Sequence, residues 1–279
     1  MKLLVRILGR DLSWRIGRAL YMTARGEGLN DMSDNGEALL VHRVVTSIAA
    51  ERRQAPAVVV DCGANLGEWT AMAQASFDGA KVAGNYHMME PSPQSNAAIS
   101  ARFSGDDRVT VHAVALSDRD GEAEFHLVSP TGGTNSLIAT ETSAAQTITV
   151  KVARGAAYFS ALGIGGIDLL KIDTEGHDFA VIEGFAEMLE AKAIKVIQFE
   201  YNFRWLASGR AMRNIFEAAE RYGYRVGRAN GSGIDVYDCW NAENDRFFEW
   251  NYLLIAPEMV ESLGAREMRW GPSNTLIPA

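Results

Sequence analysis

Short apolar runs alternate with stretches of helical periodicity along most of the chain. Residues 57–60 are apolar and rich in β-branched side chains, which predicts a strand buried on both faces. Strands are also predicted at residues 82–89, 109–115, 167–173 and 194–199, and residues 224–228 and 251–256 are expected to form a final strand pair. Helical periodicity predicts helices at residues 68–77, 92–103, 178–189 and 212–221. Because strands alternate with helices, we expect right-handed βαβ units and a mostly parallel sheet.

Two regions interrupt this alternation. Residues 122–128 and 147–152 alternate between apolar and polar positions, which predicts a β-excursion around the polar loop 131–136. The last two predicted strands have no convincing helix between them, so we expect the final strand to run antiparallel. The polar and aromatic insertion at residues 231–250 matches no motif.

The first 54 residues predict a helical cap or lid on a main domain that spans residues 55–279. One helix precedes a break at residues 26–31, and a second begins near Asn35 and continues to Ile48. Apolar residues of the first helix fall on or near one face: Leu3, Leu4, Ile7, Leu8, Leu12, Ile16 and Leu20. We expect this face to pack on the main domain. The arginine-rich polar face leaves a peripheral membrane contact open as the alternative.

Composition narrows the class of protein. The chain has 279 residues and a formal net charge of −8, which argues against DNA or bulk RNA as the main partner. Cys62 and Cys239 match no metal-binding spacing, so we expect free thiols and a cytoplasmic protein. No apolar run reaches the ~20 residues that a membrane-spanning helix needs.

A glycine loop follows the first predicted strand. Gly63 and Gly67 flank Asn65 in a turn that lets the backbone approach a ligand, and the next helix presents its N-terminus there. Asp61 comes directly before this loop. Its carboxylate would repel a pyrophosphate and attract the ammonium group of a methionine moiety, so it favours S-adenosylmethionine over NAD as the cofactor.

Further acidic residues follow the next strands. Glu90 ends the second predicted strand, where a carboxylate accepts hydrogen bonds from both ribose hydroxyls. Ser117 and Asp118 follow the third strand, where we expect the adenine amino group. The alternative is that Asp61 and Glu90 are solvated charges at strand ends.

These residues resemble the FkbM family of methyltransferases over residues 35–257. The resemblance depends on VDCGANLG (60–67), MEPSP (89–93), VALSD (114–118) and DLLKIDTEGHD (168–178), with QFEY (198–201) and NGE (35–37) in support. It implies an α/β fold with a Rossmann-like class I methyltransferase sheet. It also implies O-methylation of a hydroxyl, often of a sugar in a glycan or of a secondary metabolite.

The reacting end of the site is expected after the fourth and fifth strands. Methyl transfer to a hydroxyl benefits from a general base, and His177, Glu200, Asp173 and Glu175 are the candidates. His177 has the intrinsic pKa for this role, and Asp173 is also expected at the cofactor. Asp173 and Glu200 could instead hold a divalent cation, but without a third fixed ligand we expect no metal. Lys171 is expected to pair with Asp173 or Glu200.

The acceptor side is the least defined part of the sequence. Asn35 and Glu37, with Tyr21 and Arg25, are candidates for a lid, and Tyr201 and Trp240 are candidates for contact with a small-molecule or glycan acceptor. The aromatic residues of the insertion could equally form a core under a loop. A homo-oligomer, an NAD-dependent oxidoreductase on the same kind of sheet, and a non-catalytic binding protein all stay open.

Overall fold

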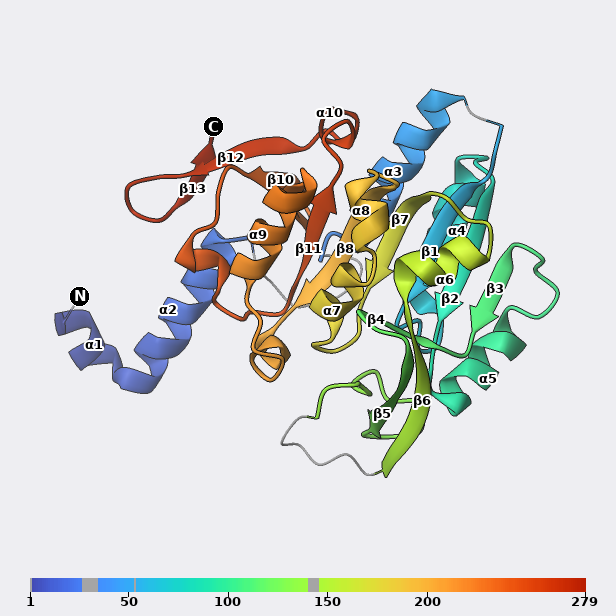
Figure 1. Cartoon of the computed structure of the whole chain (residues 1–279). Helices are drawn as coiled ribbons and strands as arrows, with labels where there is room; N and C mark the ends of the chain where they lie inside the picture. Colours follow the sequence, from blue (N-terminus) through green and yellow to red (C-terminus); the bar gives the residue numbers. More distant parts are fainter. Residues whose placement is uncertain (1, 27–34, 53, 140–145) are drawn as a thin grey trace.

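The computed structural model describes residues 2–26, 35–52, 54–139 and 146–279. Within these residues, ten strands form one sheet in the order β13-β12-β10-β9-β11-β8-β7-β1-β2-β3 (Figure 1). The strands are β1 (Ala57–Cys62), β2 (Gly84–Met89), β3 (Val109–His112), β7 (Ile167–Ile172), β8 (Ile194–Tyr201), β9 (Arg225–Asn230), β10 (Gly233–Tyr237), β11 (Trp250–Ile255), β12 (Arg266–Trp270) and β13 (Leu276–Pro278).

The direction of the strands confirms the expected sheet. Strands β3, β2, β1, β7 and β8 are parallel to their neighbours, and β11 lies antiparallel between β8 and β9. This antiparallel strand near the end of the chain distinguishes the class I methyltransferase sheet from an all-parallel dinucleotide-binding sheet. Strands β10, β12 and β13 extend the sheet from segments in which the sequence predicted no strand.

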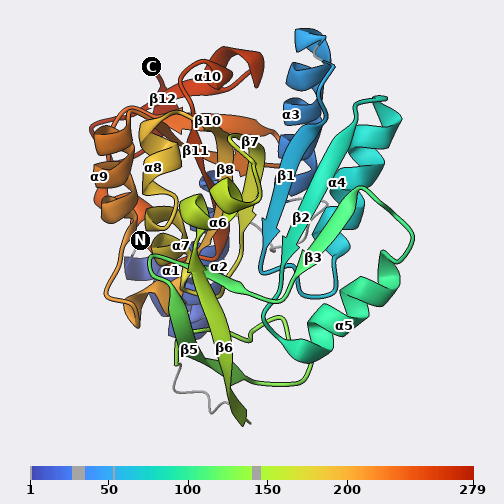
Figure 2. The same cartoon turned by 45° about the vertical axis from the view of Figure 1, so that its right-hand side comes forward.

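Helices cover both faces of the sheet. Helices α3, α4 and α5 lie on one face, and α6, α7, α8 and α9 lie on the other (Figures 1 and 2). Their bounds are α3 (Glu37–Glu51), α4 (Glu68–Gly79), α5 (Pro93–Arg102), α6 (Gly155–Ala161), α7 (Asp178–Glu183), α8 (Ala186–Glu190) and α9 (Met212–Tyr222). Short turns complete the described elements: η1 (Phe203–Leu206), η2 (Ala242–Asn244) and α10 (Met259–Ser262).

A second sheet projects below the main one (Figure 2). It has the order β4-β6-β5, with β4 (Ala115–Ser117), β5 (Gly121–Leu127) and β6 (Gln146–Arg154), which confirms the predicted β-excursion. The expected third strand, however, did not run through to Ala115. It ends at His112, and Ala115 pairs with Val152 of β6 instead. The second sheet thereby places Leu116 and Ser117 next to the end of the main sheet.

The helix predicted at residues 178–189 is broken in two. Gly184 separates α7 from α8, and its Cα lies so close to β4 that an added Cβ would be 1.9 Å from the Ser117 carbonyl oxygen. The apolar periodicity could not reveal this approach, because it depends on the second sheet.

The N-terminal helices divide between core and surface. The apolar side chains of α3, including Leu40, Val44 and Ile48, belong to the same hydrophobic core as the sheet. Helix α3 lies on the N-terminal side of the domain boundary predicted at residue 54 and packs in the core of the main domain. The boundary itself stays a prediction. The break expected at residues 26–31 lies mostly outside the described residues.

The first predicted helix is two helices, α1 (Lys2–Leu8) and α2 (Arg10–Ala24), because Gly9 adopts φ +78° between them. The expectation that its apolar face packs on the main domain was wrong. No residue of α2 is buried, and Leu3 and Ile7 of α1 and Leu20 of α2 are exposed. None of the described helices is both long and apolar enough to cross a membrane.

Candidate functional site

Two cavities meet at the carboxyl ends of the parallel strands, and both are lined by Gly63, Asn65, Gly133 and Asp173. The first cavity lies between β1, β2 and the second sheet. Besides Asp173, its walls contain apolar side chains and a second acid: Met89, Leu116, Phe125, Leu137 and Glu90. The second cavity lies toward β7, β8 and the start of α3. Mostly charged and amide side chains line it: Asn35, Glu37, Glu68, Lys171, Glu200 and Asn251.

The turn after β1 creates the junction between the two cavities. Gly63 has φ +84°, and an added Cβ would lie 1.9 Å from the Asp173 carbonyl oxygen. The Asp173 N–H donates to the Cys62 carbonyl at 2.9 Å, so the ends of β1 and β7 are joined directly. Gly67, at φ +75°, precedes the first residue of α4. Only glycine fits at position 63, because the backbone of this turn lies directly against the backbone at Asp173.

Glu90 lies where the sequence predicted it, at the wall of the first cavity. Its Oε2 accepts from the Asn65 N–H and its Oε1 accepts from the Ser92 N–H, both at 2.8 Å. Burial raises the pKa of Glu90 to about 7, although these two hydrogen bonds oppose the rise. Each carboxylate oxygen keeps a further lone pair, so Glu90 can still accept hydrogen bonds from a ligand diol.

Asp61 differs from the sequence prediction. It lines neither cavity, and its carboxylate is 1% exposed. Oδ2 accepts from the Thr70 hydroxyl at 2.6 Å, and Oδ1 lies 3.6 Å from Lys171 Nζ. Asp61 and Lys171 are register partners on adjacent parallel strands, so their side chains leave the sheet on the same face. The carboxylate expected to attract a methionine ammonium group instead neutralises a buried lysine.

Lys171 also pairs with Asp173, as the sequence predicted, at 3.1 Å from Nζ to Oδ2. Burial would lower the pKa of Lys171, but the charges of Asp173, Asp61 and Glu37 outweigh burial and raise it. The lysine therefore stays charged at the floor of the second cavity. Asp173, whose side chain is 37% exposed, is the acid that faces both cavities.

Three carboxylates converge beside this junction. One oxygen from each of Asp173, Glu175 and Glu200 lies within 4.8 Å of the others. Burial, followed by the charge of Asp173, raises the pKa of Glu175 to about 8 and raises that of Glu200 as well. Arg204 Nη1 lies 2.7 Å from Glu175 Oε2, and the Asn202 amide donates to Glu200 Oε2 at 2.6 Å.

This cluster contains the third oxygen donor that the sequence reasoning lacked, and such a set suits a hard divalent cation. Arg204 and Lys171 already lie beside the cluster as counter-charges to Glu175 and Asp173. The expectation of no metal stays a prediction.

His177 lies at the first cavity and not at the second. Its Nε2 lies 3.0 Å from the Ser117 hydroxyl, and burial lowers its pKa to about 4. Ser117 is buried and its hydroxyl donates to Asp118 Oδ1 at 3.1 Å, while Asp118 itself is exposed. Leu116 lines the first cavity, but its neighbours Ser117 and Asp118 do not. At the place where the sequence predicted a polar contact to adenine, the cavity wall is therefore apolar.

The expected lid residues separate into two places. Asn35 and Glu37 line the second cavity, where the Asn35 amide donates to Glu37 Oε2 at 3.0 Å. Tyr21 and Arg25 contact Glu243 and line neither of the two cavities. Asn251 lines the second cavity from the antiparallel strand β11. No sequence signal pointed to it, because its strand is otherwise apolar.

The two aromatic candidates lie outside both cavities. Tyr201 is fully buried, its ring centroid is 4.9 Å from that of Trp205, and its hydroxyl donates to Asp245. The Trp240 indole donates to the same residue, Asp245, at 2.7 Å. Tyr237 and Trp250 of the insertion are also buried, as expected for an aromatic core under a loop.

Comparisons with known proteins agree with this geometry. The family model described as the methyltransferase FkbM domain matches residues 61–226, which is more than half of the chain. No curated protein matches the chain.

The solved structures that match the chain include several methyltransferases. A methyltransferase FkbM from Methylobacillus flagellatus KT is 14% identical, with 76% of this chain and 47% of that chain covered and a TM-score of 0.47. A precorrin-6y C5,15-methyltransferase from Geobacter metallireducens GS-15 is 15% identical, with coverage of 77% and 87% and a TM-score of 0.36. An S-adenosylmethionine-dependent methyltransferase from Agrobacterium tumefaciens is 9% identical, with coverage of 79% and 62% and a TM-score of 0.38.

The chain spans about half the length of the Methylobacillus protein. The family match covers the glycine turn, Glu90 and the acidic cluster, which are the features that form the two cavities. The chain therefore belongs to the FkbM family of methyltransferases, and its cofactor is S-adenosylmethionine.

Proposed function

We propose that this protein transfers a methyl group from S-adenosylmethionine to a hydroxyl of a sugar, a glycan or a secondary metabolite. The observation that carries this proposal is Asp173, which faces both cavities while Glu200 lines only the second. One cavity suits a nucleoside, and the other suits cationic groups beside a proton acceptor.

The residues of the first cavity fit the adenosine part of the cofactor. Leu116, Phe125 and Leu137 offer apolar contacts to a purine, and Glu90 offers acceptor lone pairs to the ribose hydroxyls. The backbone around Gly63 allows close approach, since no side chain covers it.

The second cavity fits the methionine part. Four carboxylates and one ammonium group line it: Glu37, Glu68, Asp173, Glu200 and Lys171. This excess of negative charge attracts the cofactor's ammonium and sulfonium groups. We assign the ammonium group to Asp173 and not to Asp61, because Asp173 is partly exposed at the junction whereas Asp61 is buried against Lys171.

When bound, S-adenosylmethionine supplies an electrophilic methyl group. Glu200 accepts the proton of the acceptor hydroxyl, because its raised pKa brings a carboxylate closer to the basicity that proton removal near neutral pH requires. Asn202 holds the Glu200 carboxylate in place, and burial, followed by the charges of Asp173 and Glu175, raises the pKa of Glu200. His177 is assigned to the adenosine end, with no part in proton transfer.

The experiment has two parts. Calorimetry measures the binding of S-adenosylhomocysteine, and transfer of radiolabel from methyl-labelled S-adenosylmethionine is measured on a panel of free sugars, glycans and hydroxylated metabolites. Binding together with alkali-stable label on a hydroxyl acceptor supports the proposal. Label found only on amines, or binding without transfer to any acceptor, contradicts it. The second result would identify a non-catalytic binding protein.

A further inference from the structure

Helices α1 and α2 project from the body of the protein (Figure 1). No residue of α2 is buried. Large hydrophobic side chains that are exposed on the two helices are Leu3, Ile7, Leu12, Trp14, Ile16 and Leu20. So dense a group of exposed apolar residues on two short helices indicates a surface that binds something.

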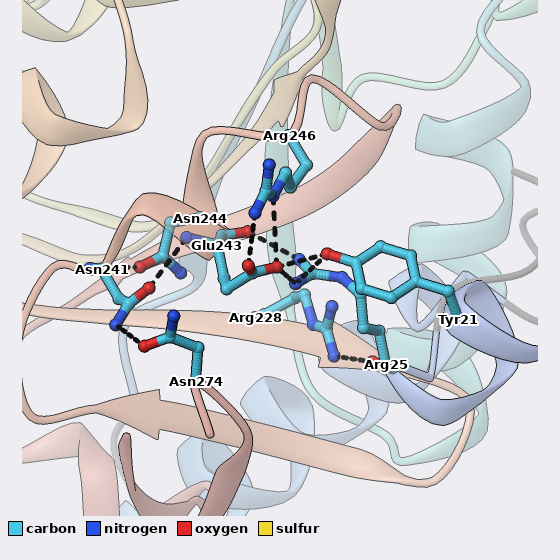
Figure 3. A network of polar contacts seen from close by, with 8 residues as sticks. All are labelled: Tyr21, Arg25, Arg228, Asn241, Glu243, Asn244, Arg246 and Asn274. Carbon is cyan, nitrogen blue, oxygen red and sulfur yellow. Dashed lines mark hydrogen bonds and ion pairs between the residues drawn. The ribbon is translucent and has the colours of Figure 1, made fainter. Parts of the chain in front are cut away.

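A polar network holds the C-terminal end of α2 on the body (Figure 3). The Tyr21 hydroxyl and the Arg25 guanidinium both donate to the Glu243 carboxylate, and Arg25 Nη2 also donates to the Glu243 carbonyl at 2.9 Å. Arg246 binds the same carboxylate, and Arg228 donates to the Arg25 carbonyl. The helix is therefore fixed to the body at one end.

The face of α2 that meets the body differs from its apolar face. Arg18 and Tyr21 both contact the Phe248 ring, at 5.7 Å and 6.2 Å from its centroid. Leu12, Ile16 and Leu20 follow one another at intervals of four, so they form one stripe, and at 100° per residue this stripe lies on the opposite side of the helix. Docking through Phe248 turns the stripe away from the body.

The charge of the two helices indicates the partner. Residues 2–24 carry five basic side chains and one acidic side chain in a chain whose net charge is −8. Arg6, Arg10 and Arg15 form no ion pair within the part of the chain that the structure describes. A second copy docked stripe against stripe would bring equal positive charges together, which disfavours that partner. Guanidinium groups beside an apolar stripe match anionic headgroups above acyl chains.

We propose that α1 and α2 bind the protein to the surface of an anionic lipid bilayer. Leu12, Ile16 and Leu20 enter the boundary between headgroups and acyl chains, and the arginines contact the headgroups. Because the network around Glu243 fixes α2, the bilayer meets the protein at one defined side. This contact is independent of methyl transfer.

The test is co-sedimentation of the full chain with vesicles of phosphatidylcholine containing phosphatidylglycerol, compared with vesicles of phosphatidylcholine alone. We expect binding to the anionic vesicles that weakens as salt is added. The triple variant Leu12→Ser, Ile16→Ser, Leu20→Ser should lose about tenfold or more in affinity, since it removes three apolar anchors. Arg10→Gln with Arg15→Gln should weaken binding and reduce its dependence on salt. Leu162→Ser and Arg213→Gln, which change exposed residues elsewhere, are matched controls that should bind normally.

Because α2 has no buried residue, circular dichroism and the melting temperature of the triple variant should match those of the unmodified protein. Undiminished binding of that correctly folded variant would overturn the proposal, as would equal binding to both kinds of vesicle. Absence of vesicle binding together with a doubled mass in light scattering, lost in the triple variant, would identify the stripe as a self-association surface and would also overturn it.

Discussion

The two cavities at the sheet edge are built in different ways. The first is formed largely by residues 62–137, through one glycine turn, one strand-end glutamate and the apolar side chains of a small second sheet. The second combines side chains from the start of α3, from the β1–α4 turn, and from the ends of β7, β8 and β11. Backbone geometry shapes the first, and the balance of buried charges shapes the second.

This difference decides what a substitution does. A change at Glu90 in the first cavity should alter cofactor affinity, and a change at Glu200 in the second should alter turnover. Substitution of a residue that only supports the cavities should lower stability and leave cofactor affinity and turnover unchanged.

The largest expected effect is at Glu200. Glu200→Gln keeps the shape of the side chain and can still accept from Asn202, but it cannot take up the acceptor proton. Turnover should fall roughly 100-fold or more, while the dissociation constant for S-adenosylhomocysteine stays within about twofold. Glu217→Gln, an exposed glutamate on α9, is the control. Normal turnover of Glu200→Gln would show that Glu200 is not the general base.

Glu90 should behave in the opposite way. Both carboxylate oxygens of Glu90 accept hydrogen bonds from backbone N–H groups, whereas glutamine has only one acceptor oxygen. Glu90→Gln should therefore weaken S-adenosylhomocysteine binding by about tenfold to 100-fold. Calorimetry measures the change, and exposed Glu124→Gln serves as the control. If affinity is unchanged while turnover falls, the division between the two cavities is wrong.

Asp61 tests whether a buried residue supports both cavities without touching the cofactor. Asp61→Asn leaves Lys171 with one fewer counter-charge, and the free energy of unfolding should fall by about 3 kcal/mol. Thr70→Val, which removes only the hydrogen bond, should cost about 1 kcal/mol. Urea unfolding measures both. Loss of affinity at full stability would instead restore the contact to the cofactor that the sequence predicted.

A smaller effect concerns pH. His112 lies behind the first cavity, where its carbonyl accepts from the Glu90 N–H, and its ring contacts those of His87 and Tyr158. Burial lowers the pKa of His112 to about 4 and also lowers the pKa of His87. The folded state therefore prefers neutral rings, so the contribution of these rings to stability is complete above about pH 6.5 and declines as pH falls toward 4.

The contribution of His112 adds to the opposite contribution of the buried acids Glu90 and Glu175, whose raised pKa values favour the folded state as pH falls. Between neutral pH and about pH 5, the change in melting temperature should therefore shift toward higher stability at the lower pH in His112→Gln. Exposed His42→Gln should leave this change as it is in the unmodified protein. An equally steep dependence in His112→Gln would show that other groups cause it.

The smallest expected effect is that of a chelator. Because Arg204 and Lys171 balance charge within the acidic cluster, methyl transfer should be unchanged in EDTA. Loss of activity that Mg²⁺ restores would mean that Asp173, Glu175 and Glu200 hold a cation, and the second cavity would then need a metal for its charge balance.

The sheet and the first cavity could largely be predicted from the sequence. Strands β1, β7, β8 and β11 fall on predicted apolar runs, because a strand buried on both faces requires continuous hydrophobicity, and β2 and β9 also overlap predicted strands. Gly63 and Glu90 lie as expected, since a local turn and a strand end fix their positions. His177 was misplaced because residues only a few positions past the end of β7 line different cavities.

The sequence by itself determined the order of strands and helices, the glycine turn and the family, because each depends on residues close together along the chain. Only the tertiary structure decided that Asp61 pairs with Lys171, that Asn251 joins the second cavity, and that the apolar stripe of α2 faces outward. Those outcomes depend on which strands become neighbours and on what packs against a helix, and periodicity carries no information about distant partners.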